Sequence, residues 1–260
     1  MSKNTSETVL ITGASSGIGR ELAKLFAKDG SNLVLVARRE DRLKELADEL
    51  ESKYRTKTYV LPKDLARKTA QREILSFIKK NKIDLDVLVN NAGFGSRAPF
   101  AEIPAGSISD MVEVNVGALT NLTRLFLPKM IEKNSGGILN VGSLAGFQPG
   151  PNMAVYYATK AYVISFTEAL SEELIHTNIK VSCLAPGPVN TEFGEKSDLE
   201  DSILFKLSLM NVEPVAKAGY EGLRKGKTIV IPGARNNITP FLVRFMPRFI
   251  VRKVVKAIQS

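Results

Sequence analysis

Short apolar runs alternate with longer amphipathic segments along most of this chain. The apolar runs are rich in Val, Ile and Leu, which is typical of strands buried on both faces, and they lie at 7–12, 32–37, 56–61, 85–89, 137–141, 180–184 and 228–232. Between them, apolar residues at helical spacing predict helices over 18–29, 41–52, 68–80, 108–133 and 152–176. Strands and helices that alternate in this way form parallel βαβ units. The pattern predicts an α/β fold, a doubly wound parallel sheet of about seven strands in three αβα layers.

Residues that suit ligand binding follow the ends of the predicted strands. They are a Gly-rich loop at Thr12–Gly19, Arg38, Asp64, the run Asn90–Gly93, Ser143 and Pro186. In doubly wound sheets, ligands bind beyond the carboxyl ends of the strands. We therefore expect these residues to converge at one edge of one sheet.

The first two strand ends indicate a dinucleotide. The loop T-G-A-S-S-G-I-G stands between a strand and a helix, where glycines admit a phosphate and the helix N-terminus supplies N–H donors. The second strand ends in Ala37, Arg38 and Arg39, where an acidic residue would hold the ribose hydroxyls of NAD(H). Two guanidinium groups suit the 2′-phosphate of NADP(H), so NADP(H) is favoured over NAD(H). The alternative is that Arg38 and Arg39 are only surface charges at the start of the next helix.

A hydroxyl, a phenol and an amine occur together in the stretch 143–160. Tyr156 and Lys160 are four residues apart on a predicted helix and project from the same face, and Ser143 follows a strand end. A cation beside a phenol stabilises the phenolate and lowers the phenol pKa from about 10. The spacing also occurs by chance in many helices, so the strand-end residues beside it are what favour a proton-transfer site.

With its motifs in view, the chain resembles a short-chain dehydrogenase/reductase of the single-domain, carbonyl/ketoacyl reductase-like type, which has a Rossmann-type sheet. The matches cover about residues 7–191 in order: T-G-A-S-S-G-I-G, N-N-A-G, an Asn within the long predicted helix (Asn115), a Ser thirteen residues before a Tyr, Y-Y-A-T-K and P-G-P-V-N-T. The sequence departs from the ketoacyl reductases of fatty-acid synthesis after 228–232, where a further helical extension follows, so an acyl-carrier-protein substrate is not expected.

The resemblance implies a role for each matching residue. Tyr156 would protonate a carbonyl oxygen as the nicotinamide delivers hydride, and Lys160 would lower the pKa of Tyr156 and bind the nicotinamide ribose. Ser143 would hold the carbonyl, and Asn115 would order a water that links Lys160 to solvent. The residues implied in cofactor binding are Gly13, Ser15, Ser16, Gly17, Ile18, Gly19, Arg38, Arg39, Asp64, Leu65, Asn90, Asn91, Ala92, Gly93, Tyr156, Lys160, Pro186, Gly187, Val189 and Thr191. Hydride transfer of this kind needs no metal.

The composition of the chain narrows the classes of protein to which it can belong. A length of 260 residues with 44% hydrophobic and 24% charged residues is typical of a globular protein, which we expect to be one domain over 1–260. The first residues lack the apolar core of a signal peptide and there is one cysteine, Cys183, so we expect a cytoplasmic protein without disulfides. One His and one Cys are too few for a usual zinc site.

The net charge of +9 is concentrated near the C-terminus. Glu221 is the last acidic residue, nine basic residues follow it, and the chain up to Glu221 is neutral. This distribution is not a nucleic-acid signature, and no nucleic-acid partner is expected. In the tail, 234–260, apolar residues recur at helical spacing beside a basic stripe. Pro240 and Pro247 divide the tail into two short helices. The apolar set is Phe241, Leu242, Phe245, Met246, Phe249, Ile250, Val254 and Ile258, and the basic set is Arg244, Arg248, Arg252 and Lys256. Such a helix suits an anionic membrane surface, or it covers a substrate pocket or a subunit interface; we favour the covering role.

These observations predict an NADPH-dependent oxidoreductase that reduces a ketone, aldehyde or 3-oxoacyl group to an alcohol. The segment 192–211 matches the family's substrate lid, and its apolar residues (Ile203, Leu204, Phe205, Leu207, Leu209 and Met210) suit an apolar substrate. The alternatives are a membrane-associated reductase of lipid-like substrates and a non-enzymatic NADP(H)-sensing protein, which is disfavoured because both Tyr156 and Lys160 are present. The resemblance also implies a homodimer or homotetramer.

Overall fold

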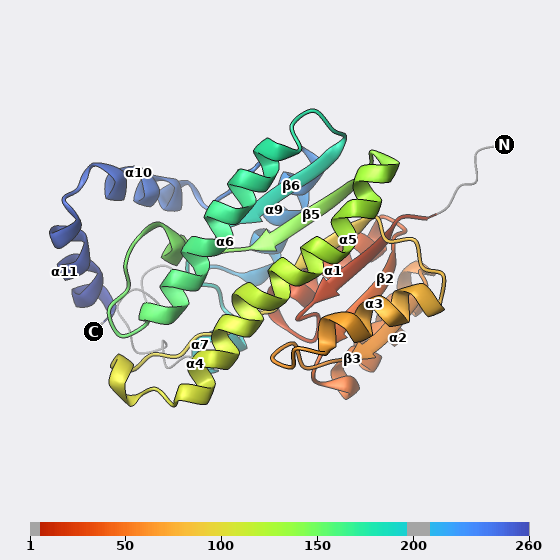
Figure 1. The fold of residues 1–260 in the computed structure, drawn as a ribbon, viewed down its shortest axis with the longest axis horizontal. Helices are drawn as coiled ribbons and strands as arrows, with labels where there is room; N and C mark the ends of the chain where they lie inside the picture. The colour runs from red at the N-terminus through yellow and green to blue at the C-terminus, as the bar shows by residue number, and fades with distance from the viewer. Residues whose placement is uncertain (1–5, 197–208, 260) are drawn as a thin grey trace.

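A single parallel sheet forms the centre of the computed structural model, which describes residues 6–196 and 209–259 (Figure 1). Its strands are β1 (Thr8–Thr12), β2 (Asn32–Ala37), β3 (Thr58–Pro62), β4 (Val87–Asn90), β5 (Gly136–Val141), β6 (Ile179–Leu184) and β7 (Ile229–Val230), in the order β3-β2-β1-β4-β5-β6-β7. Every neighbouring pair is parallel. The predicted doubly wound fold is confirmed, and each predicted strand lies within two residues of its expected bounds.

Helices cover both faces of the sheet. One face carries α1 (Gly17–Lys28), α2 (Glu40–Tyr54) and α9 (Val212–Arg224), and the other carries α3 (Ala70–Lys80), α5 (Leu119–Lys133) and α6 (Ala154–Glu173). The remaining helices include α4 (Ala105–Val112), α7 (Glu192–Lys196), α10 (Ile238–Phe245) and α11 (Arg248–Gln259). The last two lie together at the side of the molecule opposite the start of the chain (Figure 1).

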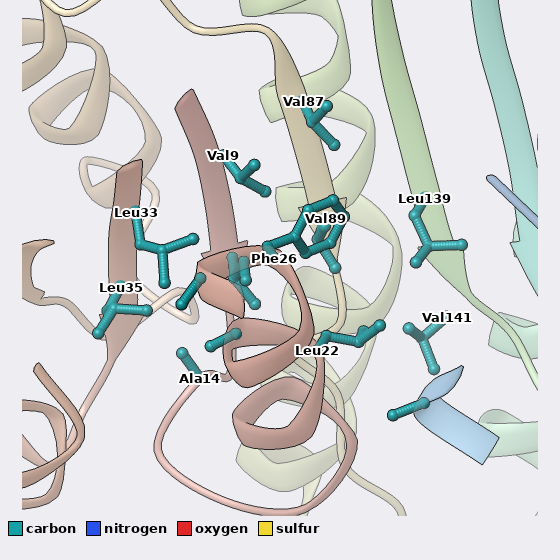
Figure 2. Close-up of a cluster of buried hydrophobic side chains, with 14 of the residues drawn as sticks. Val9, Ala14, Leu22, Phe26, Leu33, Leu35, Val87, Val89, Leu139 and Val141 are labelled. Carbon is teal, nitrogen blue, oxygen red and sulfur yellow. The ribbon is translucent and has the colours of Figure 1, made fainter. Parts of the chain in front are cut away.

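The alternation of side chains along each strand divides the core between the two faces. In β1, Val9 and Ile11 join the cluster under α1, whereas Leu10 joins the cluster on the opposite face. Figure 2 shows Leu22 and Phe26 of α1 lying against side chains from β1, β2, β4 and β5. Burial on both faces explains why the strands are continuously apolar.

The helix predicted over 108–133 is divided by a π-helical turn. α4 ends at Val112, the π-helical turn spans Glu113–Ala118, and α5 continues from Leu119. The apolar periodicity is kept on both sides, and the turn contains Asn115. Such π-helical turns occur often at functional sites.

The C-terminal part follows the prediction in outline. α10 and α11 lie on either side of Pro247, and β7 is shorter than the predicted strand at 228–232 because the chain turns at Gly233, whose φ is +86°. Of the predicted lid, α7 and residues 209–211 are described, and Met210 pairs with Val189. Ile203, Leu204, Phe205 and Leu207 lie outside the described residues. Within the described ranges, no helix has the length and apolar character needed to cross a membrane.

Candidate active site

The Gly-rich loop after β1 is held tightly against the end of β4. Gly13 has a φ of +66°, and a Cβ there would lie 2.7 Å from Asn91 Nδ2. A Cβ on Gly19 would collide with the Gly13 carbonyl oxygen. Only glycine fits both positions, since one needs a left-handed backbone and the other leaves no room for a side chain. The backbone of the loop is therefore exposed to the space beyond the strands.

Hydrogen bonds fix the ends of β1 and β4 to each other. Thr12 Oγ1 accepts bonds from the backbone N–H groups of Asn91 and Ala92, both at 3.0 Å, and Asn91 Nδ2 donates to the Thr12 carbonyl at 2.8 Å. Asn90 is turned into the core instead, where its amide donates to Thr123 and Asn140. Asn90 is therefore a structural residue, and Asn91 is the asparagine that faces the ligand space.

Arg39 lies over the Gly-rich loop after β2. Its guanidinium donates to Ser15 Oγ at 3.2 Å and to Ser16 Oγ at 2.9 Å. The same group pairs with Glu192 at 2.7 Å, and Arg42 pairs with the other oxygen of that carboxylate. Arg39 is thus the central cation at this end of the site, whereas Arg38 is exposed at its margin. Asp64 lies nearby after β3 and accepts a bond from the backbone N–H of Ala66 at 3.2 Å.

Tyr156 and Lys160 lie on one face of α6, and both side chains are buried. The Lys160 ammonium is 5.7 Å from the centre of the Tyr156 ring, and it donates to the Val141 carbonyl at 2.8 Å. Ser143 begins the short helix after β5, where its Oγ accepts a bond from the Ala145 N–H at 3.1 Å. The Ser143 hydroxyl also donates to the Pro186 carbonyl at 3.4 Å. The predicted trio is therefore assembled, although it is drawn from a strand end and a helix.

Burial controls the protonation of both titrating groups. Burial raises the pKa of Tyr156 above its ordinary value, and the neighbouring Ser143 hydroxyl opposes this only in part. Burial lowers the pKa of Lys160 to about 8. Desolvation of the phenol is the largest cause of its shift, so Tyr156 holds its proton at neutral pH. The expectation that Lys160 lowers the pKa of Tyr156 stays a prediction.

Asn115 uses its side chain to position the loop after β4. Its Nδ2 donates to the Phe94 carbonyl at 2.9 Å and to Thr159 Oγ1 at 3.1 Å, while its Oδ1 accepts from the Phe94 N–H at 3.1 Å. A Cβ on Gly93 would lie 3.1 Å from Asn115 Oδ1 and 3.4 Å from the Lys160 ammonium. The amide thus holds the loop beside Lys160; its expected role in ordering a water stays a prediction.

One cavity of about 620 Å³ connects these groups. Every predicted catalytic and cofactor-binding residue lines it except Asn90, Gly19 and Asn115, which support the wall from behind. It reaches from Arg39 past Tyr156 to the tail, and the tail residues that line it are Asn236, Thr239, Leu242, Val243, Met246, Val251, Val254, Val255 and Ile258. The covering role expected of the tail's apolar set therefore holds for half of that set, Leu242, Met246, Val254 and Ile258, whereas Phe241, Phe245, Phe249 and Ile250 do not line the cavity.

Comparison with known proteins agrees with this arrangement. A sequence model of the short chain dehydrogenases matches residues 7–201. The NADP-dependent 3-hydroxy acid dehydrogenase of Schizosaccharomyces pombe is 35% identical over 239 residues, which are 89% of this chain and 92% of that protein. This chain belongs to the short-chain dehydrogenase family.

Solved structures show how far the likeness extends. A short-chain dehydrogenase from Sphingobium yanoikuyae in complex with NADPH has a TM-score of 0.81 and 31% identity, over 93% of this chain and 97% of that one. A bulky-bulky ketone specific alcohol dehydrogenase from Comamonas testosteroni has a TM-score of 0.77 and 29% identity, over 93% of this chain and 95% of that one. The likeness to these dehydrogenases therefore covers nearly the whole chain.

Sequence reasoning missed several residues at the substrate side of this dehydrogenase. Phe193 of α7 lies against Tyr156 with ring centres 5.3 Å apart, and Val251 and Val255 of α11 belong to the buried cluster that includes Tyr156 and Tyr157. The sequence signal for the two valines was their four-residue spacing. They were overlooked because the tail offers more apolar residues than one helix face can bury.

Proposed function

We propose that this short-chain dehydrogenase reduces a ketone, aldehyde or 3-oxoacyl group to an alcohol with NADPH. The observation that carries the proposal is that Ser143, Tyr156 and Lys160 line the same cavity as the Gly-rich loop and Arg39. A dinucleotide that bound along this cavity would have its phosphates at one end and its reactive ring near the phenol. NADP(H) supplies the hydride when it is bound.

The residues at the phosphate end fit a phosphorylated dinucleotide. Exposed loop backbone beside Gly13 admits a pyrophosphate, and the start of α1 adds N–H donors. Arg39, with the hydroxyls of Ser15 and Ser16, offers a cation and donors for a 2′-phosphate. The NADP-dependent yeast relative and the NADPH-bound neighbour support the same preference, and NAD(H) is the less favoured alternative.

At the other end, Tyr156 is the general acid of the proposed reaction. Its raised pKa keeps the phenol protonated, so it can donate a proton to a carbonyl oxygen as the alcohol forms. Ser143 holds that oxygen through its hydroxyl. The Lys160 ammonium stabilises the phenolate left behind and is protonated below about pH 8. Asn115 positions the loop that packs beside Lys160.

The cavity walls favour an apolar group on the carbonyl carbon. Met153, Tyr157, Phe193 and Val251 line the cavity close to Tyr156 and belong to its apolar cluster. Ketones with bulky apolar substituents bury more surface there than small polar ones do. We therefore propose an apolar carbonyl compound as the substrate class.

Replacing one hydroxyl tests the assignment. Tyr156→Phe is expected to abolish oxidation of NADPH by an apolar ketone and to leave the dissociation constant for NADPH within about twofold, because the ring is kept. Tyr162→Phe is the matched control, since Tyr162 lies on the same helix but is exposed and bonds Thr120. Turnover by Tyr156→Phe at the wild-type rate would refute the proposed general acid. No oxidation of NADPH by the wild type with any carbonyl compound would instead favour a protein that only senses NADP(H).

Self-association is a further part of the proposal. Ile131 of α5 and Tyr162 of α6 are exposed, and Tyr162 stacks on Phe166. These apolar groups would be covered if the α5 and α6 helices of two copies met in a homodimer or homotetramer. Sedimentation equilibrium at micromolar concentration tests this, and a monomer at all concentrations would contradict it.

A further inference from the structure

The outward face of α10 is apolar and uncovered. Ile238, Phe241, Leu242 and Phe245 recur at the spacing of one helix face, and they are 55%, 64%, 52% and 71% exposed. α10 has no buried residue. The rings of Phe241 and Phe245 lie 4.8 Å apart, so they form one exposed aromatic patch. The predicted apolar stripe of the tail is thus divided, and only part of it covers the cavity.

The next helix, α11, also has a buried side and an exposed side. Val251 and Val255 are buried in the same apolar cluster as Tyr156 and Tyr157, so the opposite side of α11 must face outward. On the exposed surface of α11 lie Phe249 and Ile250. Figure 1 shows α10 and α11 joined at an angle, at the end of the molecule opposite the start of the chain. The surface formed by Ile238, Phe241, Leu242, Phe245, Phe249 and Ile250 is called here the outer tail face.

Basic residues lie on the same two helices as the outer tail face, and neither helix has an Asp or Glu in its sequence. Arg244, Arg248 and Arg252 are exposed on α10 and α11, with Lys253 and Lys256 beside them. No Asp or Glu follows Glu221 in the sequence. A second copy that met this face with its own tail would bring like charges together. An anionic surface would instead be attracted while the aromatic patch was covered.

We propose that the outer tail face docks on an anionic lipid bilayer. Phe241, Phe245 and Phe249 enter the boundary between headgroups and acyl chains, and the arginines pair with lipid phosphates. Aromatic side chains on one part of a helix surface and cations on another are the features of helices that lie in the bilayer interface. Charge complementarity is the argument for lipid over a second copy of this chain.

Docking would place the opening of the cavity at the lipid surface. Leu242 and Val254 both line the cavity and remain about half exposed, so they mark its opening on the tail side. An apolar substrate dissolved in the bilayer would then reach Tyr156 without crossing water. This consequence rests on the proposed reductase function, whereas the docking itself does not.

Vesicle co-sedimentation of the full chain tests the docking. The wild type is expected to bind phosphatidylcholine vesicles that contain phosphatidylserine, and to bind vesicles of phosphatidylcholine alone far more weakly. The variant Arg244→Gln/Arg248→Gln/Arg252→Gln should bind the anionic vesicles about 100-fold more weakly, since each cation near such a surface contributes about fivefold. The variant Phe241→Ser/Phe245→Ser/Phe249→Ser should lose binding to a similar degree.

Matched controls separate docking from general effects. Ile175→Ser removes an equally exposed apolar residue beyond α6, and Lys53→Gln/Lys79→Gln/Lys80→Gln removes three exposed cations from α2 and α3. Both controls should bind vesicles like the wild type. The phenylalanine variant should retain NADPH oxidation with a water-soluble ketone, because its three positions do not line the cavity.

Three outcomes would overturn the docking proposal. The first is that the wild type does not bind anionic vesicles. The second is that the arginine and phenylalanine variants bind these vesicles as tightly as the wild type. The third is that the wild type forms a dimer that the phenylalanine substitutions dissociate. Tyr156→Phe should still bind the vesicles. Loss of turnover and loss of docking are therefore measured separately, and failure of the reductase function is distinguishable from failure of the docking.

Discussion

The carboxylate of Glu192 pairs with Arg39, the cation that we propose for the 2′-phosphate of NADPH. Glu192 begins α7 and pairs with both Arg39 and Arg42, and Arg39 also binds the hydroxyls of Ser15 and Ser16. A cofactor phosphate that used Arg39 would have to displace this carboxylate or share the cation with it. We therefore predict that Glu192→Gln strengthens NADPH binding.

The size of this effect follows from the exposure of the pairs. The side chains of Arg39, Arg42 and Glu192 are 32%, 40% and 29% exposed, so solvent screens both ion pairs. Partly exposed pairs contribute about 0.2–1 kcal/mol each, so releasing two of them yields at most about 2 kcal/mol. The dissociation constant for NADPH should fall by about 2- to 30-fold in Glu192→Gln. The constant for NADH, which has no 2′-phosphate, should change by less than about twofold.

Equilibrium titration of the nicotinamide fluorescence, without substrate, measures both constants. Binding is preferred to turnover because the neighbouring Phe193 lies against Tyr156 and could alter the chemical step. Glu21→Gln is a suitable control, since Glu21 pairs with Lys24 and does not line the cavity. An unchanged NADPH constant would refute the competition, and equal strengthening of NADH and NADPH would show that the 2′-phosphate is not what Glu192 opposes.

Two further predictions concern Lys160 and Asn115. The pKa of Lys160 is lowered to about 8, so its charge is present below that pH and is lost above it. We therefore expect kcat/KM for ketone reduction to fall as the pH rises through about 8. A pH profile that stays flat to pH 9 would contradict a role for the ammonium. Asn115→Ala removes three hydrogen bonds and leaves the N–H and carbonyl of Phe94 without these partners, so the free energy of unfolding should fall by about 2–4 kcal/mol. Urea denaturation measures this loss, with Asn81→Ala at an exposed position as the control. A loss below about 0.5 kcal/mol would contradict the positioning role.

The sheet and the catalytic edge could be predicted because their signals are local. Each buried strand is an apolar run, and parallel strands end at the same edge, so placing Gly13, Ser143 and Pro186 after strands was enough to bring them together. Tyr156 and Lys160 needed only helical spacing. The orientation of Asn90 was not predictable in this way, since Asn90 and Asn91 are adjacent and only the pleat decides which one faces the core.

The remaining features depend on contacts between distant segments. Arg39 and Glu192 are 153 residues apart, and nothing near either residue signals the pair. The π-helical turn around Asn115 keeps the apolar period on both sides, so the sequence pattern does not reveal it. In the tail, apolar residues surround most of each short helix, and the packing of Val251 and Val255 into the cluster around Tyr156 decides which side is buried.

The two faces of the tail require different experiments. Deleting residues 234–260 would remove the wall formed by Val251 and Val255 together with the outer tail face, so lost activity would not distinguish an opened cavity from lost docking. The two faces can be changed separately, because Val243 and Met246 line the cavity whereas Phe241 and Phe245 do not and are exposed. Changes at the phenylalanines should alter access to lipid-dissolved substrate alone. Changes at the valines should alter the reaction even in water.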